Sequence, residues 1–392
     1  MAKTFLSQAA AWLISVLIRF STTVHWSERN APVRYLGEQE VEDIAMGAAV
    51  MASGGGGNPY VGILIAKQCV AENGPIPLLT LDELPDEARV AVSMGLGAPT
   101  VLVEKVPAGP EPVYALEALE REVGHTFDAL IPSEAGGWNS LHPMLPAAQR
   151  HIPLLDADGM GRAFPELQMV TWSMYGQSAS PIGVADERGN TMLIHAATNK
   201  CGEDLCRGAT VEMGGNISLA CYGMTGAEAK AHSVAGTYTL CENVGRILRR
   251  ARDERSNDIS ELRDALGAVE LFRGKVEDVE RRTVGGFARG LVHLEGMDAY
   301  KGDVLDVRFQ NEFLIAERNG EVVCTAPDLI AMFDSETLTP ITGEALKYGC
   351  RAIVLGIPCA PQWRTSEGLA TVGPAVFGYE GVEFIPVEER YK

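Results

Sequence analysis

The residues best suited to chemistry gather in one stretch, residues 131–176, where polar side chains alternate with apolar runs. Its candidate acids, bases and polar ligands are Glu134, Asn139, His142, Asp156, Asp158, Arg162 and Glu166. Residues 127–131 and 151–155 are typical of short buried strands, and Asp156 and Asp158 follow the second one. Ligands of an open α/β sheet bind beyond the carboxyl ends of its strands. The stretch therefore predicts a functional site at that edge of a sheet.

A purely structural role explains part of the same pattern. An Asp side chain readily accepts hydrogen bonds from nearby backbone N–H groups, so Asp156 and Asp158 also fit as turn caps. Gly159 and Gly161 fit turn positions with positive φ. Either explanation suits a single carboxylate, whereas the whole group of four acidic residues, with Glu134 and Glu166 added, favours a site.

A second candidate is the glycine run at residues 54–57, which ends an expected helix and precedes Asn58 and Pro59. Bare backbone N–H groups ahead of a helix N-terminus can hold an anion or a carbonyl oxygen. No Gly-Lys-Ser/Thr follows, so the run is not a Walker loop. Pro59 stands where a dinucleotide fingerprint needs its third glycine. The run is either a binding loop or a flexible turn.

Composition limits the classes of partner. The 392-residue chain has 33 basic and 52 acidic residues, a formal net charge of −19. Such acidity argues against nucleic acid or an anionic membrane surface as a partner. The eight cysteines are scattered and include no C-x-x-C pair. This usage favours reduced thiols and a cytoplasmic location.

Residues 1–32 are interpreted as an N-terminal extension. They contain a ten-residue apolar run, 9–18, that is too short to span a bilayer. The core of a signal peptide is an alternative, although no clear small-residue cleavage site follows it.

The spacing of apolar residues predicts an α/β domain over residues 33–200. Helices are expected at 41–51, 60–70, 115–123 and 141–150, and strands at 89–97, 127–131 and 151–155. Alternation of this kind builds a parallel sheet covered by helices on both faces, which is a three-layer α/β domain. A hairpin is expected between 181–185 and 191–195.

A second, β-rich domain is predicted over residues 201–392. One long helix is expected at 226–252, followed by strands within 284–294, 304–316, 322–332 and 350–358. Asn319 and Gly320 give a strong hairpin signal between two of these runs. We expect an antiparallel, barrel-like sheet, because closure removes exposed strand edges. The whole chain is thus a mixed α/β protein.

Several blocks of sequence are familiar from one family. They are Asp43-Ile-Ala-Met-Gly-Ala-Ala, the Gly54–Gly57 run with Asn58-Pro59-Tyr60, Glu134 with Gly136-Gly137 and Asn139-Ser140, Asp156-Ala-Asp158-Gly-Met-Gly-Arg162-Ala-Phe-Pro-Glu166-Leu-Gln-Met, and Gly373-Pro374 with Phe377-Gly-Tyr379. From about Arg34 onward, the chain resembles the family long called DUF917 and now described as S-methyl thiohydantoin desulfurase-like. The family usually carries Asp where Asn58 stands, a difference that matters if that carboxylate is a ligand or a base.

The resemblance implies an α/β domain followed by a β-barrel-like domain, and a part in hydantoin and thiohydantoin breakdown. The named reaction replaces the sulfur of an S-methyl thiohydantoin ring by oxygen from water and releases a thiol. The expected partner is therefore a small cyclic-amide-type substrate, with neither nucleic acid nor a membrane involved. A homo-oligomer is compatible with the resemblance.

That reaction needs a base for water, an acid for the ring nitrogen or the leaving sulfur, and donors for the ring carbonyls. The expected catalytic carboxyls are Asp156, Asp158, Glu134 and Glu166. Arg162 is expected to hold a substrate carboxylate with two hydrogen bonds. The expected substrate-binding groups for the ring are Gly55, Gly56, Gly57, Asn58 and Asn139.

A divalent metal ion is a candidate cofactor, since it would make hydroxide available near neutral pH. Its expected ligands are Asp156, Asp158, Glu134 and His142. Two other functions stay open: a metal-dependent hydrolase that opens hydantoin-type cyclic amides, and a non-catalytic ligand-binding subunit of a hydantoinase-type system. A ring-opened product, a released thiol or an absence of catalysis separates the three.

Overall fold

A computed structural model describes residues 33–391, except 57–58, 98–100, 102–106 and 285–286. Tyr35–Lys392 form one compact unit, to which the description below applies. The expected N-terminal extension, residues 1–32, lies outside the described residues. Within the described residues, no helix is long and apolar enough to cross a membrane.

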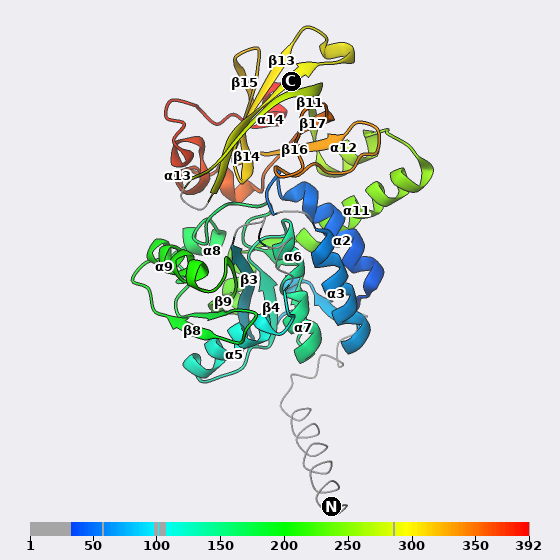
Figure 1. Cartoon of the computed structure of the whole chain (residues 1–392). Helices are drawn as coiled ribbons and strands as arrows, with labels where there is room; N and C mark the ends of the chain where they lie inside the picture. The colour runs from blue at the N-terminus through cyan, green and yellow to red at the C-terminus, as the bar shows by residue number, and fades with distance from the viewer. Residues whose placement is uncertain (1–32, 57–58, 98–100, 102–106, 285–286, 392) are drawn as a thin grey trace, which may run out of the picture. The chain divides into compact units, whose positions relative to one another are not determined.

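The first half of the unit is built on an eight-stranded mixed sheet (Figure 1). In spatial order its strands are β1 (Arg34–Leu36), β2 (Ile76–Leu79), β5 (Leu154–Leu155), β4 (Ala129–Pro132), β3 (Arg89–Gly97), β9 (Asn216–Thr225), β7 (Ile182–Ala185) and β8 (Thr191–Ile194). The neighbours from β2 to β3 pair in parallel, and β9, β7 and β8 add antiparallel pairs. The carboxyl ends of β3 and β4 therefore lie at the same edge of the sheet.

The helices pack in groups around this sheet. They are α2 (Glu38–Met51), α3 (Tyr60–Asn73), α5 (Glu111–Val123), α6 (Trp138–Leu141), α7 (Met144–Arg150), α8 (Thr171–Met174), α9 (Asn199–Glu212), α10 (Gly226–His232), α11 (Thr237–Glu254) and α12 (Ser260–Leu266). Helix α2 packs against α3 and α11, while α5 and α9 pack on the strands β7 to β9 and their neighbours.

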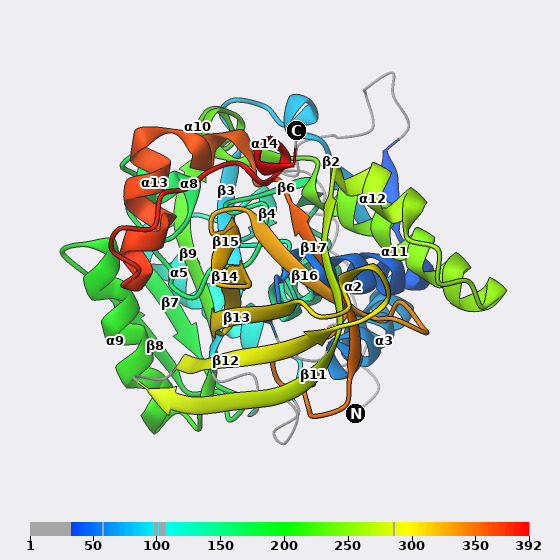
Figure 2. The same cartoon turned by 90° about the horizontal axis from the view of Figure 1, so that it is seen from above.

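The second half of the unit is a seven-stranded antiparallel sheet that curls into a half-barrel (Figure 2). Its order is β15 (Glu321–Thr325), β14 (Glu312–Arg318), β13 (Val304–Gln310), β12 (Phe287–Gly296), β11 (Val269–Val284), β17 (Arg351–Ile357) and β16 (Leu329–Asp334). Apolar side chains on its inner face, among them Phe272, Phe309 and Phe313, form a buried core. Two short helices, α13 (Ser366–Val372) and α14 (Val387–Arg390), follow the last strand.

The structure confirms the expected mixed α/β class with a barrel-like second sheet. Strand β3 has the expected bounds, and β7 pairs with β8 as the expected hairpin. Asn319 and Gly320, with φ of 53° and 83°, turn the chain between β14 and β15. The sheet starts at β15 and ends at β16, so its barrel-like form is that of a half-barrel.

Several expected elements are wrong in their extent, among them the helix at 141–150 and the run at 322–332, each of which is two elements. The long helix at 226–252 is interrupted, because Val234 and Ala235 pair with Asp158 and Ala157 of β6 (Ala157–Asp158). The expected strand at 304–316 is two strands, since the chain turns back at Asn311, whose φ is 59°. Asn tolerates this left-handed conformation better than most residues. The error in the long helix comes from pairing with a segment distant in sequence, and the error at 304–316 comes from a tight turn inside the expected strand.

The first sheet and its helices continue past residue 200, the boundary expected from the sequence. Strand β9 lies inside the eight-stranded sheet, and α11 packs on α2. The eight-stranded sheet contains strands from both sides of residue 200. The two-domain division at that residue stays a prediction.

Helices α2 and α11 cross with their backbones in contact. A Cβ atom added to Gly47 of α2 would overlap the carbonyl oxygen of Cys241, and one added to Gly245 of α11 would overlap that of Asp43. The Asp43 carboxylate then accepts two hydrogen bonds from Arg249, at 2.8 and 2.9 Å. This crossing fixes the end of α2, which leads into the glycine run.

Replacing Gly245 by Ala is expected to destabilise the protein by about 2 kcal/mol or more, because the helices must separate to admit the methyl group. Gly208 of α9 is a matched control, as its added Cβ would meet nothing within 4 Å. Gly208→Ala is expected to stabilise by about 0.5–1 kcal/mol through helix propensity. Urea unfolding gives the free energy of unfolding of both variants. Equal changes in that free energy would contradict the close contact between α2 and α11.

Candidate functional site

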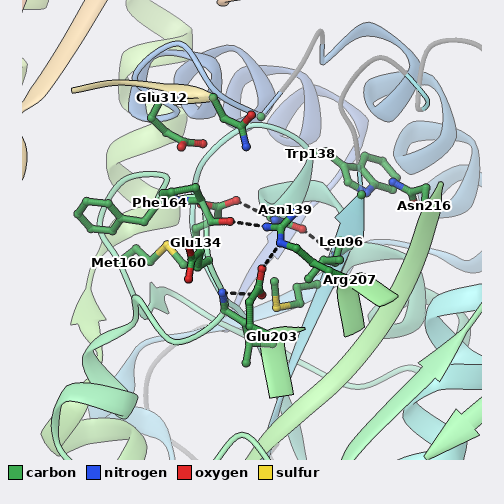
Figure 3. Close-up of a pocket in the computed structure, with 18 residues that line it drawn as sticks. Leu96, Glu134, Trp138, Asn139, Met160, Phe164, Glu203, Arg207, Asn216 and Glu312 are labelled. Atoms are coloured by element: carbon green, nitrogen blue, oxygen red, sulfur yellow. Dashed lines mark hydrogen bonds and ion pairs between the residues drawn. The ribbon is translucent and has the colours of Figure 1, made fainter. Parts of the chain in front are cut away.

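A pocket lies at the carboxyl edge of β3 and β4, where the tip of the β13–β14 hairpin meets the first sheet (Figure 3). Its lining residues are Gly56, Met94, Gly95, Leu96, Gly97, Glu134, Trp138, Asn139, Met160, Phe164, Pro165, Glu166, Leu167, Glu203, Arg207, Asn216, Asn311 and Glu312. Four of the residues expected from the sequence are among them: Gly56, Glu134, Asn139 and Glu166.

Glu134 follows β4 and is held at both carboxyl oxygens. Asn139 Nδ2 donates to Oε1 at 2.7 Å, and the backbone N–H of Phe164 donates to Oε2 at 3.2 Å. Asn139 is itself oriented by the Gly95 N–H, which donates to its Oδ1 at 2.7 Å. Burial raises the pKa of Glu134 well above its usual range, and the nearby charge of Glu312 raises it further.

Glu312 enters the same pocket from the second sheet. It is the first residue of β14, placed directly after the turn at Asn311. Its carboxyl oxygen Oε1 lies 2.2 Å from the position that a Cβ atom on Gly55 would take, so a larger residue there would have to displace the Glu312 side chain. Among the described residues, no group bonds Glu312 Oε2. Burial raises the pKa of Glu312 to about 8.

A third acidic residue in the pocket, Glu203 of α9, is already paired. Its carboxylate is buried and accepts from Arg207 Nε and, at 3.0 Å, from the Leu167 N–H. Arg207 also donates to the Pro165 carbonyl at 2.7 Å and lies over the Phe287 ring at 4.2 Å. Burial raises the pKa of Glu203, while the Arg207 charge opposes that rise.

The glycine run joins the two halves of the unit. The Gly54 carbonyl accepts from the Gly343 N–H at 2.7 Å. A Cβ atom on Gly56 would lie 2.7 Å from the Gly137 Cα, which shows how closely the two turns pack. The Gly55 N–H donates to Ala52 O at 2.9 Å, so it is not presented to a ligand. Gly57 and Asn58, also expected to bind substrate, lie outside the described residues.

Asp158 is placed beside Glu134 but does not line the pocket. Its Oδ2 accepts from the Ala135 N–H at 2.5 Å, and its Oδ1 accepts from Met160 and Gly161 at 3.2 and 2.8 Å. Burial raises its pKa to about 7. Asp158 therefore holds together the two turns that carry Glu134 and Phe164. This arrangement agrees with the structural alternative, in which Asp158 caps a turn.

Asp156 lies at the start of α11, away from the pocket lining. Its Oδ1 accepts from the Thr239 N–H at 2.9 Å, and its Oδ2 accepts from the Thr239 hydroxyl. A carboxylate at a helix N-terminus is stabilised by the unpaired N–H groups there. The structure thus gives Asp156 the role of a cap between β5 and α11.

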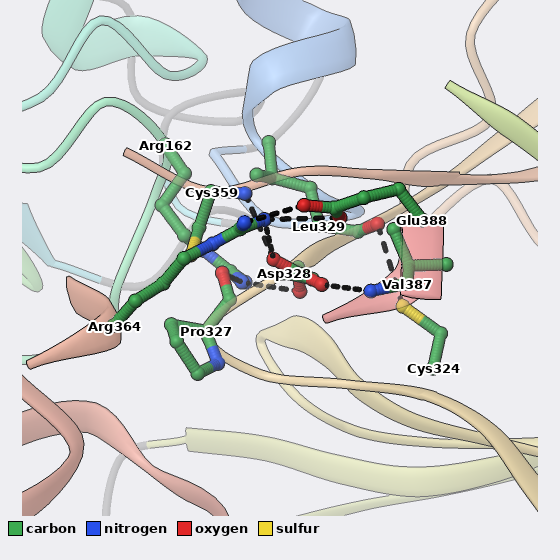
Figure 4. A network of polar contacts seen from close by, with 9 residues as sticks. All are labelled: Arg162, Cys324, Pro327, Asp328, Leu329, Cys359, Arg364, Val387 and Glu388. Atoms are coloured by element: carbon green, nitrogen blue, oxygen red, sulfur yellow. Dashed lines mark hydrogen bonds and ion pairs between the residues drawn. The ribbon is translucent and has the colours of Figure 1, made fainter. Parts of the chain in front are cut away.

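Arg162, expected to hold a substrate carboxylate, is instead fully buried between the two halves of the unit (Figure 4). Its Nη1 donates to the carbonyls of Pro327 and Asp328 at 2.7 and 2.9 Å. The Asp328 carboxylate accepts from the backbone N–H groups of Cys359 and Val387 at 2.9 and 2.7 Å. Arg162 and Asp328 thereby connect the segment 156–166 to the start of β16 and to the residues around Cys359 and Val387.

The expected metal ligands are not gathered around one point. Each nitrogen of buried His142 meets a serine hydroxyl, Ser93 at 3.1 Å and Ser218 at 2.9 Å. Burial lowers the pKa of His142 to about 3, so its ring is neutral. In the described parts of the chain, no group of three or more His, Cys, Asp or Glu side chains is arranged to hold a metal ion.

The sequence did not point to Glu312, Glu203 or Arg207. The one signal for Glu312 is that Gln310, Asn311 and Glu312 interrupt an apolar run between Phe309 and Phe313. That interruption marks a turn, but it does not say which other segment the turn meets. Glu203 and Arg207 are spaced i, i+4 on α9, a pattern equally typical of an exposed helix face.

Comparison with known proteins supplies independent findings. The model of the S-Me-THD-like, N-terminal domain matches residues 39–196, and that of the S-Me-THD-like, C-terminal domain matches residues 197–387. A crystal structure of a protein from Chromobacterium violaceum shares 23% sequence identity, with a TM-score of 0.75, over 90% of this chain and 100% of that one. At this identity the likeness shows the fold alone. No curated protein matches the chain.

Replacing Arg162 by Lys is expected to destabilise the protein by about 2 kcal/mol, because a single ammonium cannot reproduce the guanidinium's fixed hydrogen bonds to buried carbonyls. The exposed Arg308, paired with Glu317 at 3.1 Å, is the control, and its Lys variant should change stability by about 0.5 kcal/mol or less. Urea unfolding decides the matter. An Arg162→Lys variant of unchanged stability but weakened ligand binding would restore the substrate-binding role.

Glu312 gives a prediction on pH. Its pKa is about 8 in the folded protein and near 4.5 when unfolded, so between these values the folded chain keeps a proton that the unfolded chain has lost. This contribution to stability therefore falls as pH rises through that window. Glu312→Gln cannot titrate, so its stability relative to wild type should rise by up to about 1.4 kcal/mol per pH unit.

Unfolding free energies measured at half-unit steps from pH 5 to 8 check this slope. Glu87→Gln, a change at an exposed carboxylate outside the pocket, should leave the pH dependence as in wild type. A difference between Glu312→Gln and wild type that stays constant with pH would mean that Glu312 is ionised throughout.

Proposed function

The chain belongs to the S-Me-THD-like family, and from this we propose that it hydrolyses an S-methyl thiohydantoin ring, or a thiohydantoin ring, to a hydantoin with release of a thiol. The observation that carries the proposal is the pair of buried carboxyls, Glu134 and Glu312, in one pocket. A base and an acid with separate environments are what this hydrolysis requires.

In the proposed reaction, the oxygen of water bonds to the ring carbon that carries sulfur, and the carbon–sulfur bond breaks. One water proton goes to the base and is passed to the ring nitrogen of the product. The second water proton is transferred to the sulfur as the carbon–sulfur bond breaks, so that the sulfur leaves as a thiol. The products are a hydantoin and methanethiol for an S-methyl substrate, so water is the only co-reactant.

Glu134 is suited to the role of base. Two N–H groups, from Asn139 and Phe164, donate to its oxygens, an arrangement that favours the carboxylate over the acid. Burial and the nearby Glu312 act in the opposite direction and keep its proton affinity high. A carboxylate with a raised pKa is a stronger base toward water than an exposed one.

Glu312 is suited to the role of acid. Its pKa of about 8 keeps it protonated at neutral pH, and its Oε2 has no partner within the described structure. A buried carboxylic acid with a free oxygen can donate its proton to a ring nitrogen or to the leaving sulfur.

The walls of the pocket suit a flat heterocycle. Trp138 and Phe164 supply aromatic surface, and Met160 and Leu167 add apolar contacts. The indole Nε1 of Trp138 is buried without a hydrogen-bond partner among the described residues, so it is a donor for a ring carbonyl. Asn139 holds Glu134 in place and in this proposal is a positioning residue.

The same carboxyl pair would also serve a hydrolase that opens the ring of a cyclic amide, with or without a metal ion. A binding subunit would need the pocket but not the acid–base pair. Product identity separates these functions: a free thiol with an intact hydantoin, an opened ring, or binding without turnover.

The test is thiol release by the purified full chain from an S-methyl thiohydantoin, with and without a chelator. Glu134→Gln and Glu312→Gln should each lower kcat by about 100-fold or more, since each removes one acid–base group. In wild type, kcat/KM should fall above a pH near 8 as Glu312 loses its proton, and this limb should vanish in Glu312→Gln.

Glu87→Gln is the control and should retain full activity, because its carboxylate is exposed and outside the pocket. Full activity of both pocket variants would overturn the acid–base assignment. Ring opening in place of thiol release would move the function to a cyclic-amide hydrolase, and loss of activity with the chelator would add a metal ion to either reaction.

A further inference from the structure

Three asparagines line the pocket, and one of them has a free side chain. The carboxamide of Asn139 is bonded at both ends, and the Oδ1 of Asn311 accepts from the Ala288 N–H at 2.9 Å. Asn216, the first residue of β9, is half-buried and makes no side-chain hydrogen bond to any described residue. Its carboxamide therefore presents an acceptor oxygen and two N–H donors to a ligand.

Two glycines of β3 make room for polar groups on this wall of the pocket. Gly95 and Gly97 are two residues apart, so Cβ atoms added to them would point to the same face of the strand. A Cβ atom on Gly97 would lie 2.8 Å from Asn216 Nδ2, and one on Gly95 would lie 2.8 Å from Trp138 Nε1. The carboxamide and the indole N–H therefore lie over strand positions that are about 7 Å apart. Figure 3 shows the two side chains next to each other.

The chemical complement of these two groups is an amide edge of a ring. In a cyclic amide or imide the N–H and the C=O lie on the same side, so a carboxamide can accept from the one and donate to the other. Asparagine binds adenine in the same bidentate way. The indole Nε1 of Trp138 has no partner among the described residues. Because a carbonyl oxygen has two lone pairs, this N–H can donate to the same ring carbonyl from its other side.

We propose that Asn216 is a specificity-determining residue of the pocket and binds the adjacent N–H and C=O groups of the substrate ring. The proposal rests on the proposed function for the reaction at the sulfur-bearing carbon. In an S-methyl thiohydantoin that carries a proton beside its carbonyl, this edge consists of the ring nitrogen N3 and the carbonyl at C4. The sulfur-bearing carbon is the next ring atom, so the pairing fixes its position without covering it.

The experiment compares 1-methylhydantoin, which keeps the N–H between its two carbonyls, with 1,3-dimethylhydantoin, in which a methyl group replaces that hydrogen. Binding of both compounds to the full chain is measured by calorimetry. The dimethyl compound should bind at least tenfold more weakly, which corresponds to about 1.4 kcal/mol. The physical reason is that its second methyl group leaves the Asn216 oxygen facing an apolar group without a hydrogen bond.

Two variants test whether Asn216 causes this preference. Asn216→Leu keeps the size of the side chain and Asn216→Ala shortens it, and both should reduce the preference to about threefold or less, since neither side chain forms hydrogen bonds. Asn257→Ala, at an exposed asparagine outside the pocket, should leave the preference unchanged. Equal binding of the two compounds by wild type, a preference that both Asn216 variants retain, or no binding of either compound would overturn the proposal.

Thiol release from an S-methyl thiohydantoin separates this proposal from the desulfurase function. Both Asn216 variants should lower kcat/KM by about tenfold, in line with the loss of binding. The expected binding preference without thiol release by wild type would refute the desulfurase function, while the amide-binding role of Asn216 stands. Thiol release with an unchanged kcat/KM in both Asn216 variants would overturn that role, while the desulfurase function stands.

Discussion

The pocket depends on the close approach of the glycine run after α2 to the tip of the β13–β14 hairpin. The Phe313 N–H donates to Ser53 O at 2.6 Å and the Gly343 N–H to Gly54 O at 2.7 Å, so backbone atoms of the two halves of the unit are directly bonded. Gly55 leaves the space that the Glu312 carboxyl occupies. Larger residues in the run would push the hairpin, and Glu312 with it, out of the pocket.

This approach has an electrostatic consequence. It buries Glu312 near Glu134, and burying an ionised carboxyl costs several kcal/mol unless it is neutralised by a proton or a counter-charge. Two N–H groups donate to Glu134, and one oxygen of Glu312 has no partner among the described residues, yet burial raises the pKa of both carboxyls. Burial of the two carboxyls thus lowers the stability of the protein and also gives the pocket its capacity for acid–base chemistry.

Local pattern was sufficient for much of the fold and for half of the carboxyl pair. Strand β3 and the Asn319-Gly320 turn follow from spacing and turn chemistry, and Glu134 follows from its place after a buried strand. Glu312 escaped because only the pairing of distant segments brings a hairpin tip into the pocket. The interpretation of Arg162 as an anion-binding residue has the same cause. The carbonyls of Pro327 and Asp328, to which its guanidinium donates, are far along the chain and could not be foreseen from local pattern.

The central claim is that Glu312 keeps a proton at neutral pH. The most direct measurement is an infrared difference spectrum between wild type and Glu312→Gln, recorded from pH 6 to 9. We expect a protonated carboxyl band in the wild type at pH 6.5 that disappears with a midpoint near 8. A difference spectrum with only ionised carboxylate bands at pH 6.5 would contradict it and leave the pocket without its acid.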